Sequence, residues 1–344
     1  MPKTQPLVGA VILAAGKSTR MKSKTNKMMT LFEGKPMIRR VTDACQDAGI
    51  TQLVIVSGPE AQDLRHALKN DAEFVIQHER LGTGHALMQA KSFINKNIEN
   101  IIVLVGDHPF ISAEAINYLI SEHQQNAAAA SLLTVSYENP GSYGRVVRNQ
   151  LGKIVRIVEN KDASEDEKKI NEVNISTYCF NVKKALPLLE ELGTNNAQKE
   201  YYITDIIEIL LKKGERVQAL PYYDNRIGIG INNRVELANA LQVARVDNLN
   251  RLMVSGVTII DPNSTYIDFS VTIGQDTVIY PFSYIEKETR IGNDCQIGPN
   301  VRLTDAGIGN NVIAEFVVVE SSDVPDGTIM QPFTYLKGHR SIKA

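Results

Sequence analysis

The sequence predicts an α/β fold in which a doubly wound, Rossmann-like and mostly parallel sheet is followed by a short parallel β-helix. Across residues 8–130, short apolar runs alternate with amphipathic stretches, which is typical of parallel strands joined by helices. From residue 267 onward, isoleucine or leucine recurs every six residues, which indicates a hexapeptide repeat. The 344 residues are enough for two domains, each with its own core.

The sheet-forming part is predicted element by element from its apolar periodicity. Strands are expected at 8–13, 52–57, 73–76 and 101–105, and helices at 37–48, 61–69, 84–94 and 112–124. Residues 130–230 indicate an antiparallel extension, with strands at 130–135, 144–148, 154–158 and 174–180 and helices at 183–192 and 204–213. A further helix is predicted at 235–253, near the boundary between the two parts.

The hexapeptide repeat predicts a parallel β-helix whose apolar side chains stack in one inward column. Seven in-phase positions define it, which is more than chance alternation supplies. They are Ile267, Ile273, Ile279, Ile285, Ile291, Ile297 and Leu303. Ile308 follows Leu303 after only five residues, so the period is expected to slip there.

The composition excludes several classes of protein. A net charge of −2 gives no sign of a nucleic-acid partner or a polybasic membrane surface, and no apolar run has the length of a membrane span. The N-terminal residues lack the plan of a signal peptide, and three widely spaced cysteines suit reduced thiols, so we expect a cytoplasmic protein. The six histidines lack the spacing of a zinc site.

Residues 13–21, LAAGKSTRM, follow the first predicted strand and contain the Gly-Lys-Ser that ends a P-loop. Val11 stands where that motif requires its first glycine, so the strict P-loop is excluded. Small residues at a strand end nevertheless allow backbone N–H groups to approach an anion. The basic run that follows has no acidic residue and favours a triphosphate over an ordinary packing turn; it comprises Lys17, Arg20, Lys22, Lys24 and Lys27.

Asp107 follows the fourth predicted strand and is expected at the same edge of the sheet. Its carboxylate either caps a turn or binds Mg²⁺, which takes one or two protein oxygens and leaves other positions to phosphates and water. Asn232 in the loop GINNR is either a turn former or the second ligand. The residues alone leave both alternatives open.

Eight motifs in chain order resemble those of bacterial UDP-N-acetylglucosamine pyrophosphorylase, the uridylyltransferase part of the bifunctional enzyme that also acetylates glucosamine-1-phosphate. Over about residues 8–300 they read LAAGKSTRM…NK, LGTGHA, VGDHP, YGRVV, IVENKDA, EVNIS, NNAQKEYYITD and INNR. The resemblance implies a nucleotide-diphospho-sugar transferase domain at 1–232, a linker helix at 233–255, and a truncated left-handed β-helix at 256–344. It also implies a homotrimer through the β-helix.

The resemblance assigns roles to particular residues. Arg20 and Lys27 take the family's catalytic positions, and Asp107 and Asn232 take its Mg²⁺ positions. The nucleotide-binding positions fall on Leu13, Ala14, Ala15, Gly16, Gln77, Gly82 and Thr83. The sugar-binding positions fall on Gly144, Glu159, Asn174, Tyr202, Thr204 and Asn232.

The implied reaction joins UTP and N-acetylglucosamine-1-phosphate to give UDP-N-acetylglucosamine and pyrophosphate. A phosphate monoester is an adequate nucleophile at neutral pH, so catalysis by positioning and charge stabilisation is expected, without a general base. Two alternatives stay open: another sugar-1-phosphate, such as that of glucose or N-acetylgalactosamine, or an inactive regulatory homologue. The second is disfavoured because an inactive homologue is expected to lose the arginine, the lysine or the metal ligands, and all remain.

The sequence departs from the family pattern at four places. Asn26 replaces a proline before Lys27, which predicts a less rigid loop, and Ser18 stands where glycine is common. Lys199 replaces a glycine near the expected sugar site and bears on sugar specificity. The chain ends at Ala344, where the β-helix of the family continues, and His339 matches no motif of its acetyltransferase base. We therefore expect acetyl transfer to be absent.

Overall fold

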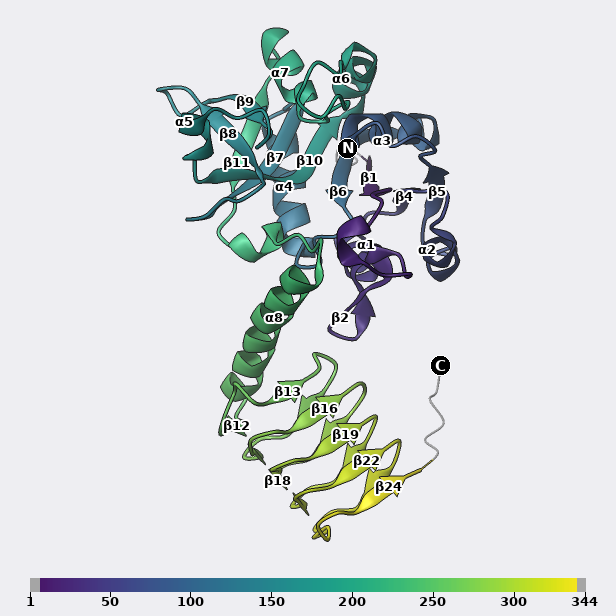
Figure 1. Ribbon diagram of the computed structural model, residues 1–344, viewed down its shortest axis with the longest axis vertical. Helices are drawn as coiled ribbons and strands as arrows, with labels where there is room; N and C mark the ends of the chain where they lie inside the picture. Colours follow the sequence, from purple (N-terminus) through teal and green to yellow (C-terminus); the bar gives the residue numbers. More distant parts are fainter. Residues whose placement is uncertain (1–6, 339–344) are drawn as a thin grey trace, which may run out of the picture. The chain divides into compact units, whose positions relative to one another are not determined.

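The computed structural model describes residues 7–338, which form two compact units (Figure 1). The first unit contains the chain up to Thr30 together with Lys35–Arg234. The second contains Leu31–Gly34 and the chain from Val235 onward. His339, on which the acetyltransferase expectation partly rested, lies outside the described residues.

A nine-stranded sheet forms the centre of the first unit within the described residues. Its main path runs β11 (Val217–Pro221), β7 (Ala130–Ser136), β10 (Glu172–Asn181), β6 (Ile98–Val105), β1 (Leu7–Ala14), β4 (Gln52–Ser57) and β5 (Glu73–Ile76). Four of the six neighbouring pairs are parallel, and only β10 runs against its neighbours, so the sheet is mostly parallel as predicted. The antiparallel strands β8 (Gly144–Arg148) and β9 (Ile154–Val158) extend it beside β10.

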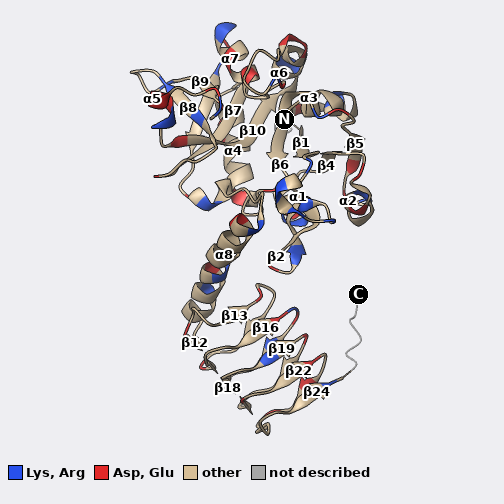
Figure 2. Cartoon of the chain, in the orientation of Figure 1, with Lys and Arg blue, Asp and Glu red and all other residues tan. Residues whose placement is uncertain are grey.

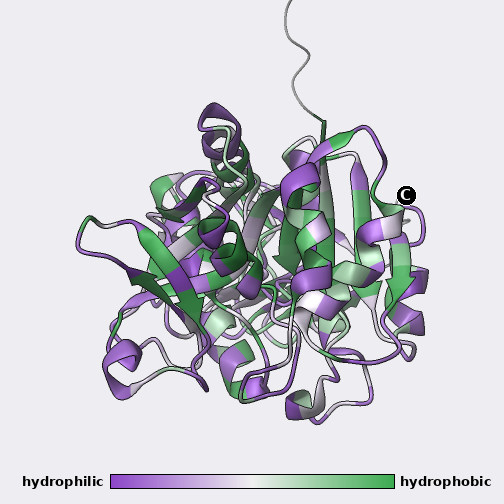
Figure 3. Cartoon of the chain, turned by 90° about the horizontal axis from the view of Figure 1, so that it is seen from above, coloured by the Kyte–Doolittle hydropathy of each residue, from purple (hydrophilic) through white to green (hydrophobic). Residues whose placement is uncertain are grey.

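Helices cover both faces of this sheet because its buried strands send alternate side chains to opposite sides. Val11 and Leu13 join the core under α3 (Thr83–Ala90) and α7 (Asp205–Lys212), whereas Ala10 and Ile12 face the opposite layer. That layer consists of α1 (Met37–Asp47), α2 (Gln62–Ala67) and α4 (Ala113–Gln125). Figure 3 shows hydrophobic strands between helices that carry hydrophilic stretches.

Most predicted elements are confirmed, four of the strands with identical bounds, but two expectations for residues 130–230 were wrong. The extension is not wholly antiparallel, because β11 was not predicted and pairs in parallel with β7. This edge strand is only partly buried, so its apolar pattern is weak. The helix expected at 183–192 is divided into α6 (Val182–Ala185) and a 3₁₀ helix, Leu186–Glu191. Pro187 lacks the N–H that a continuous helix uses.

Short elements complete the first unit. Strand β3 (Lys35–Pro36) precedes α1 in the first unit, whereas β2 (Leu31–Phe32) belongs to the second unit. A capping box formed by Ser164 and Glu167 begins α5 (Glu165–Lys168). The remaining 3₁₀ helices are η1 (Thr19–Met21), η2 (Lys27–Met29), η3 (Lys91–Phe93) and η5 (Asn225–Gly228).

The second unit contains most of α8 (Arg234–Val254), with the basic and acidic residues seen in Figure 2, and a parallel β-helix of three sheets. One sheet stacks β12 (Thr258–Ile259), β15 (Val278–Ile279), β18 (Gln296–Ile297) and β21 (Ile313–Ala314). The next stacks β13 (Tyr266–Ile267), β16 (Tyr284–Glu286), β19 (Arg302–Thr304), β22 (Val318–Glu320) and β24 (Tyr335–Lys337). The third stacks β14 (Thr272–Ile273), β17 (Arg290–Ile291), β20 (Gly307–Ile308) and β23 (Asp323–Val324).

The single inward column predicted for the repeat is wrong, because six residues advance the chain to the next face of the coil and not to the next coil. Ile267 pairs with Ile285, and Ile285 with Leu303, so residues eighteen apart stack and three columns result. The predicted slip is present: Ile291 pairs with Ile308 in a coil shortened by one residue. The helices of the described part are all too short or too polar to cross a membrane.

Candidate active site

The predicted nucleotide and metal residues lie where parallel strands end, all within the first unit. Ala15 and Gly16 follow β1, Gln77 follows β5, and Asp107 follows β6 by two residues. Since β1, β5 and β6 belong to the parallel part of one sheet, their carboxyl ends lie along the same edge. The backbone N–H of Ile231 donates to the carbonyl of Asp107, which brings the loop of Asn232 to this edge.

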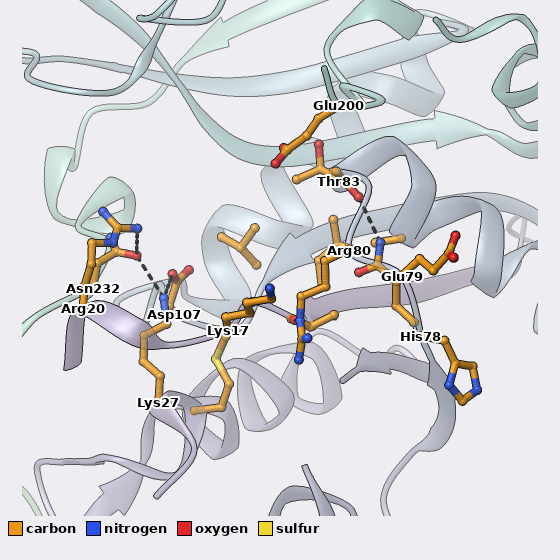
Figure 4. Close-up of a pocket in the computed structure, with 18 residues that line it drawn as sticks. Lys17, Arg20, Lys27, His78, Glu79, Arg80, Thr83, Asp107, Glu200 and Asn232 are labelled. Atoms are coloured by element: carbon orange, nitrogen blue, oxygen red, sulfur yellow. Dashed lines mark hydrogen bonds and ion pairs between the residues drawn. The ribbon is translucent and has the colours of Figure 1, made fainter. Parts of the chain in front are cut away.

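These residues surround a cleft of about 760 Å³ (Figure 4). Ten of the predicted residues line it: Leu13, Ala15, Gly16, Arg20, Lys27, Gln77, Gly82, Thr83, Asp107 and Asn232. Polar residues that were not assigned a role also line it: Lys17, His78, Glu79, Arg80 and Glu200. Figure 4 shows Arg20, Lys27, Asp107 and Asn232 gathered at one end, with Thr83 and Glu200 further along. A cleft of this size can hold a nucleotide.

At that end of the cleft, two cationic side chains donate hydrogen bonds to a carboxylate oxygen and an amide oxygen. Nζ of Lys27 lies 2.5 Å from Oδ2 of Asp107 and 3.0 Å from Oδ1 of Asn232. Nη2 of Arg20 donates to the same Asn232 oxygen over 2.9 Å. Lys27 is buried, with 7% of its surface exposed, whereas Arg20 is exposed to solvent. The cluster combines a fixed buried cation with an accessible one, which suits the binding of phosphate groups.

This arrangement stabilises the ionised form of Asp107. Burial alone would raise the pKa of Asp107, but the ammonium of Lys27 and its hydrogen bond outweigh burial and keep the pKa below its ordinary value. Burial lowers the pKa of the neighbouring His108, so its imidazole is neutral at physiological pH. Asp107 is therefore an anionic carboxylate at neutral pH, balanced chiefly by Lys27.

The loop that carries the basic residues is restrained by two of the departures from the family pattern. Oγ of Ser18 donates to the carbonyl of Gly16 and accepts a bond from the backbone N–H of Lys27. Oδ1 of Asn26 accepts from the N–H of Met28 and caps η2. Asn26 therefore supplies a side-chain cap where the resemblance leads one to expect the stiffness of proline. Ser18 has a φ of +57°, the left-handed conformation that glycine adopts most easily.

A second loop is fixed against the start of α3. Gly82 has a φ of +109°, and a Cβ there would lie 2.5 Å from the carbonyl oxygen of Tyr201. The N–H of Gly84 donates to this carbonyl, and Oγ1 of Thr83 accepts from the N–H of Ile203. The close approach requires glycine at 82, which explains the LGTG sequence at this turn.

Of the predicted sugar residues, Asn232 lines the cleft, and the other five do not. Gly144 pairs with Asn174 across β8 and β10, and Oγ1 of Thr204 donates to Oε1 of Glu159. Burial raises the pKa of Glu159, and nearby carboxylates act in the same direction. Tyr202 instead bonds to Asp162 and Gln198. Ala14, the remaining nucleotide residue, is buried in the sheet core.

Asp107 and Asn232 fit a magnesium ion by the chemistry of their oxygens. A carboxylate and an amide oxygen that share one partner at the cleft wall are ligands that Mg²⁺ accepts when phosphates and water complete its shell. Residues 7–338 contain no group of three or more His, Cys, Asp or Glu side chains suited to hold a metal alone. A magnesium ion held by these two oxygens would take its other ligands from phosphates and water.

Comparison with known proteins agrees with this arrangement. Residues 10–200 match the family described as the MobA-like NTP transferase domain, and residues 270–305 match the bacterial transferase hexapeptide repeats. A solved structure of UDP-glucose pyrophosphorylase complexed with UDP-glucose covers 70% of this chain and 99% of its own, with a TM-score of 0.59 and 20% identity. That likeness concerns the fold. The protein is thus a nucleotidyltransferase whose transferase domain is followed by a left-handed hexapeptide β-helix.

Curated relatives define the family more narrowly. The "Bifunctional protein GlmU" of Carboxydothermus hydrogenoformans is 43% identical over 95% of this chain and 73% of its own. That of Acetivibrio thermocellus is 44% identical over 95% of this chain and 71% of its own. The chain belongs to the GlmU family.

The cleft also contains residues that sequence reasoning missed. Arg80 immediately precedes the LGTGHA motif, and its Nε donates to the carbonyl of Ala15 over 2.5 Å while its guanidinium pairs with Glu60. Glu200 lies in the NNAQKEYYITD motif, next to Lys199. The sequence placed Arg80 and Glu200 beside or within recognised motifs, and this was the one available indication of a role. Their charge alone did not indicate that their side chains face the cleft.

Proposed function

We propose that the protein is a uridylyltransferase that forms UDP-N-acetylglucosamine and pyrophosphate from UTP and N-acetylglucosamine-1-phosphate. The observation that carries the proposal is the cluster of Arg20, Lys27, Asp107 and Asn232 at one end of a nucleotide-sized cleft. The cluster places two cations and two oxygen atoms able to bind a metal ion where the triphosphate and the sugar phosphate would meet. Membership of the GlmU family supports the choice of substrates.

In the proposed reaction, an oxygen of the sugar-1-phosphate attacks the α-phosphorus of UTP. A new P–O bond forms to the α-phosphorus, and the bond from that phosphorus to the oxygen bridging toward the β-phosphate breaks. Pyrophosphate leaves with the electron pair, so atoms and charge balance without a further reactant. The nucleophile is already anionic, and positioning with charge stabilisation therefore carries the catalysis.

The side chains divide this work between them. Arg20 neutralises charge that grows toward pyrophosphate, and Lys27 holds the α-phosphate or the sugar phosphate. Asp107 and Asn232 would hold Mg²⁺, which as a bound ion neutralises phosphate charge and aligns the two reacting groups. Backbone N–H groups of the turn at 13–16 receive the nucleotide, with Ala14 fixing the turn from the core.

The base and the sugar are assigned to neighbouring surfaces. Gln77, Gly82 and Thr83 line the part of the cleft proposed for uracil. Gly144, Glu159, Asn174, Tyr202 and Thr204 are proposed for the N-acetylated sugar, with Glu159 as a hydrogen-bond acceptor for a hydroxyl. Lys199 has a φ of +55°, which fits a position where the family has glycine, and its side chain is exposed.

A substrate panel tests this proposal. Pyrophosphate release is measured with UTP, CTP or ATP and with the 1-phosphates of N-acetylglucosamine, glucose and N-acetylgalactosamine, in the presence of Mg²⁺. The proposal predicts the highest kcat/KM for UTP with N-acetylglucosamine-1-phosphate. A preference for glucose or N-acetylgalactosamine would retain nucleotidyl transfer but replace the sugar. The absence of turnover with every pair would favour an inactive homologue.

We also propose a homotrimer assembled through the β-helix. Exposed aromatic side chains recur at one corner of its coils: Phe282, Phe316 and Phe333 are 65%, 41% and 86% exposed. The rings of Phe316 and Phe333 lie 5.9 Å apart in adjacent coils. Such apolar area is typical of a surface that associates. Sedimentation equilibrium is expected to give three times the chain mass, and a monomer at micromolar concentration would contradict it.

Two further expectations belong to the same proposal. Absence of acetyl transfer from acetyl-CoA to glucosamine-1-phosphate remains a prediction, and the appearance of the acetylated product would overturn it. A cytoplasmic location is supported by Cys45, Cys179 and Cys295, which are buried free thiols.

A further inference from the structure

The side-chain amide of Gln77 has a fixed orientation in the cleft wall. Its Nε2 donates to the carbonyl oxygen of Gly82 over 3.2 Å and lies 3.0 Å from Nδ1 of His85. A carbonyl oxygen only accepts hydrogen bonds, so the Gly82 contact requires the nitrogen and not the oxygen of the amide at this position. Both amide protons of Gln77 are then used inside the wall.

The second contact determines which ring nitrogen of His85 carries the proton. Because Nε2 of Gln77 is a donor, Nδ1 of His85 accepts, and the proton of the neutral imidazole resides on its Nε2. That nitrogen lies 3.1 Å from the side-chain amide of Gln89, four residues further along α3. A half-turn of the Gln89 amide places Oε1 there as the acceptor that this proton requires. The ring of His85 is also held by Tyr201, whose ring lies stacked at 6.2 Å.

A chain of hydrogen bonds therefore runs from Gln89 through His85 to Gln77, and it leaves one group of Gln77 for a ligand. Among the described residues, no donor bonds to Oε1 of Gln77, and Gln77 lines the cleft although only 3% of its surface is exposed. The wall thus presents an acceptor. Uracil has a proton on N3 and can donate to it, whereas N3 of cytosine is itself an acceptor.

We propose that His85 is a positioning residue that orients the Gln77 amide and so contributes to selection of UTP over CTP. This inference rests on the proposed function, in which Gln77 meets the base. His85 does not line the cleft and acts through Gln77, so it is not a catalytic residue. The selectivity arises because the buried oxygen of Gln77 accepts a hydrogen bond from N3 of uracil but faces a second acceptor at N3 of cytosine.

The test compares two substitutions of His85. His85→Leu keeps a side chain of similar size but removes the acceptor, and His85→Asn restores an amide oxygen near the position of Nδ1. Steady-state kinetics of pyrophosphate release are measured with UTP and with CTP. His85→Leu is expected to lower the UTP-to-CTP ratio of kcat/KM about three- to tenfold, the value of one hydrogen bond. The loss should fall on the KM for UTP, and His85→Asn should keep the ratio within about twofold of wild type.

A double-mutant cycle with Gln77→Leu separates positioning from general damage to the fold. In the Gln77→Leu background, His85→Leu is expected to leave the UTP-to-CTP ratio unchanged within about twofold, because the group through which it acts is gone. Equal loss with both nucleotides and an unchanged ratio in His85→Leu would show a merely structural role and overturn the inference.

The outcome for wild-type protein distinguishes this inference from the proposed function. Turnover that favours CTP would retain nucleotidyl transfer but overturn the orientation assigned to Gln77. If no nucleotide turns over, the proposed function fails, and the inference is tested by titration calorimetry with UTP and CTP. The same three- to tenfold change in the ratio of dissociation constants is then expected for His85→Leu, and an unchanged ratio would overturn it.

Discussion

The ammonium of Lys27 lies 2.5 Å from the carboxylate of Asp107, and it also reaches Asn232 at 3.0 Å. One buried cation therefore contacts both oxygens that we propose as ligands of Mg²⁺. A lysine in this position lowers the pKa of Asp107 and keeps the carboxylate ionised despite its burial. It also competes for these oxygens with a divalent ion, so the two cations are expected to be coupled.

Replacement of Lys27 by methionine should have opposite effects on catalysis and on metal binding. Loss of a preorganised cation is expected to lower kcat for nucleotidyl transfer about 10²- to 10³-fold. Without the competing ammonium, nucleotide-free protein should bind Mn²⁺, used as a paramagnetic substitute, at least as tightly as wild type. Electron paramagnetic resonance measures free Mn²⁺ directly. Lys24→Met is the control, because Lys24 is an exposed lysine of the same loop. Weaker Mn²⁺ binding in Lys27→Met would contradict the competition.

Arg20→Ala should lower kcat about 10²- to 10³-fold because it removes the accessible cation proposed to face the leaving pyrophosphate. Arg20 is exposed and donates a hydrogen bond to Asn232 at the surface, so thermal stability should change little. Steady-state kinetics with Lys24→Ala as the control checks the prediction. A rate near that of wild type would reject the role of Arg20.

Gly82→Ala should disrupt the loop at the start of α3, since the new Cβ would lie 2.5 Å from the Tyr201 carbonyl at a positive φ. We expect a loss of about 1–3 kcal/mol in the free energy of unfolding and a higher KM for UTP. Gly152 has a φ of +73°, and a Cβ added there would meet no atom within 4 Å, so Gly152→Ala isolates the backbone strain from the clash. Equal effects of the two substitutions would argue against a special role for the contact with Tyr201.

His123 should make stability depend on pH. It is buried between Asn100 and Ser131, and burial lowers its pKa from 6.5 to about 4. Between these pH values the unfolded chain binds more protons than the folded one. The free energy of unfolding is therefore undiminished by His123 above pH 6.5 and decreases as the pH falls toward 4. At pH 5 the loss is about 2 kcal/mol relative to pH 7.5.

Urea unfolding at the two pH values measures this loss. His123→Gln should abolish most of the difference, whereas replacement of the exposed His66 by glutamine should not. An unchanged pH difference in His123→Gln would show that other groups control it.

The strands that position the site could be predicted from sequence because buried parallel strands read as short apolar runs. Strands β4, β5, β8 and β9 have the predicted bounds, and Ala15 and Asp107 lie just after strands, as expected. The partly buried β11 was missed for the opposite reason, since its pattern is not distinct from that of a loop.

The contacts within the site could not be predicted in the same way. Lys27 and Asp107 are 80 residues apart, and Lys27 and Asn232 are 205 apart. Local patterns therefore indicated which residues carry chemistry but not that one ammonium would contact both oxygens. The hydrogen bonds of His85 were also hidden, because a histidine on an amphipathic helix gives no local sign of its partners.

The three inward columns of the β-helix show how a correct period can be given a wrong geometry. The repeat of six residues was recognised from the sequence. The number of repeats in one coil, however, depends on how the coil closes around its three sheets. Pairing of Ile267 with Ile285 makes that number three. The spacing alone does not contain this information.

The most direct test of the central claim follows the α-phosphorus of UTP. Purified protein is incubated with Mg²⁺, N-acetylglucosamine-1-phosphate and UTP labelled at the α-phosphate, and the products are separated. Nucleotidyl transfer predicts that the label appears in UDP-N-acetylglucosamine and that pyrophosphate is released in equal amount. Label recovered only as UDP with release of orthophosphate, or label that remains in UTP, would contradict the account.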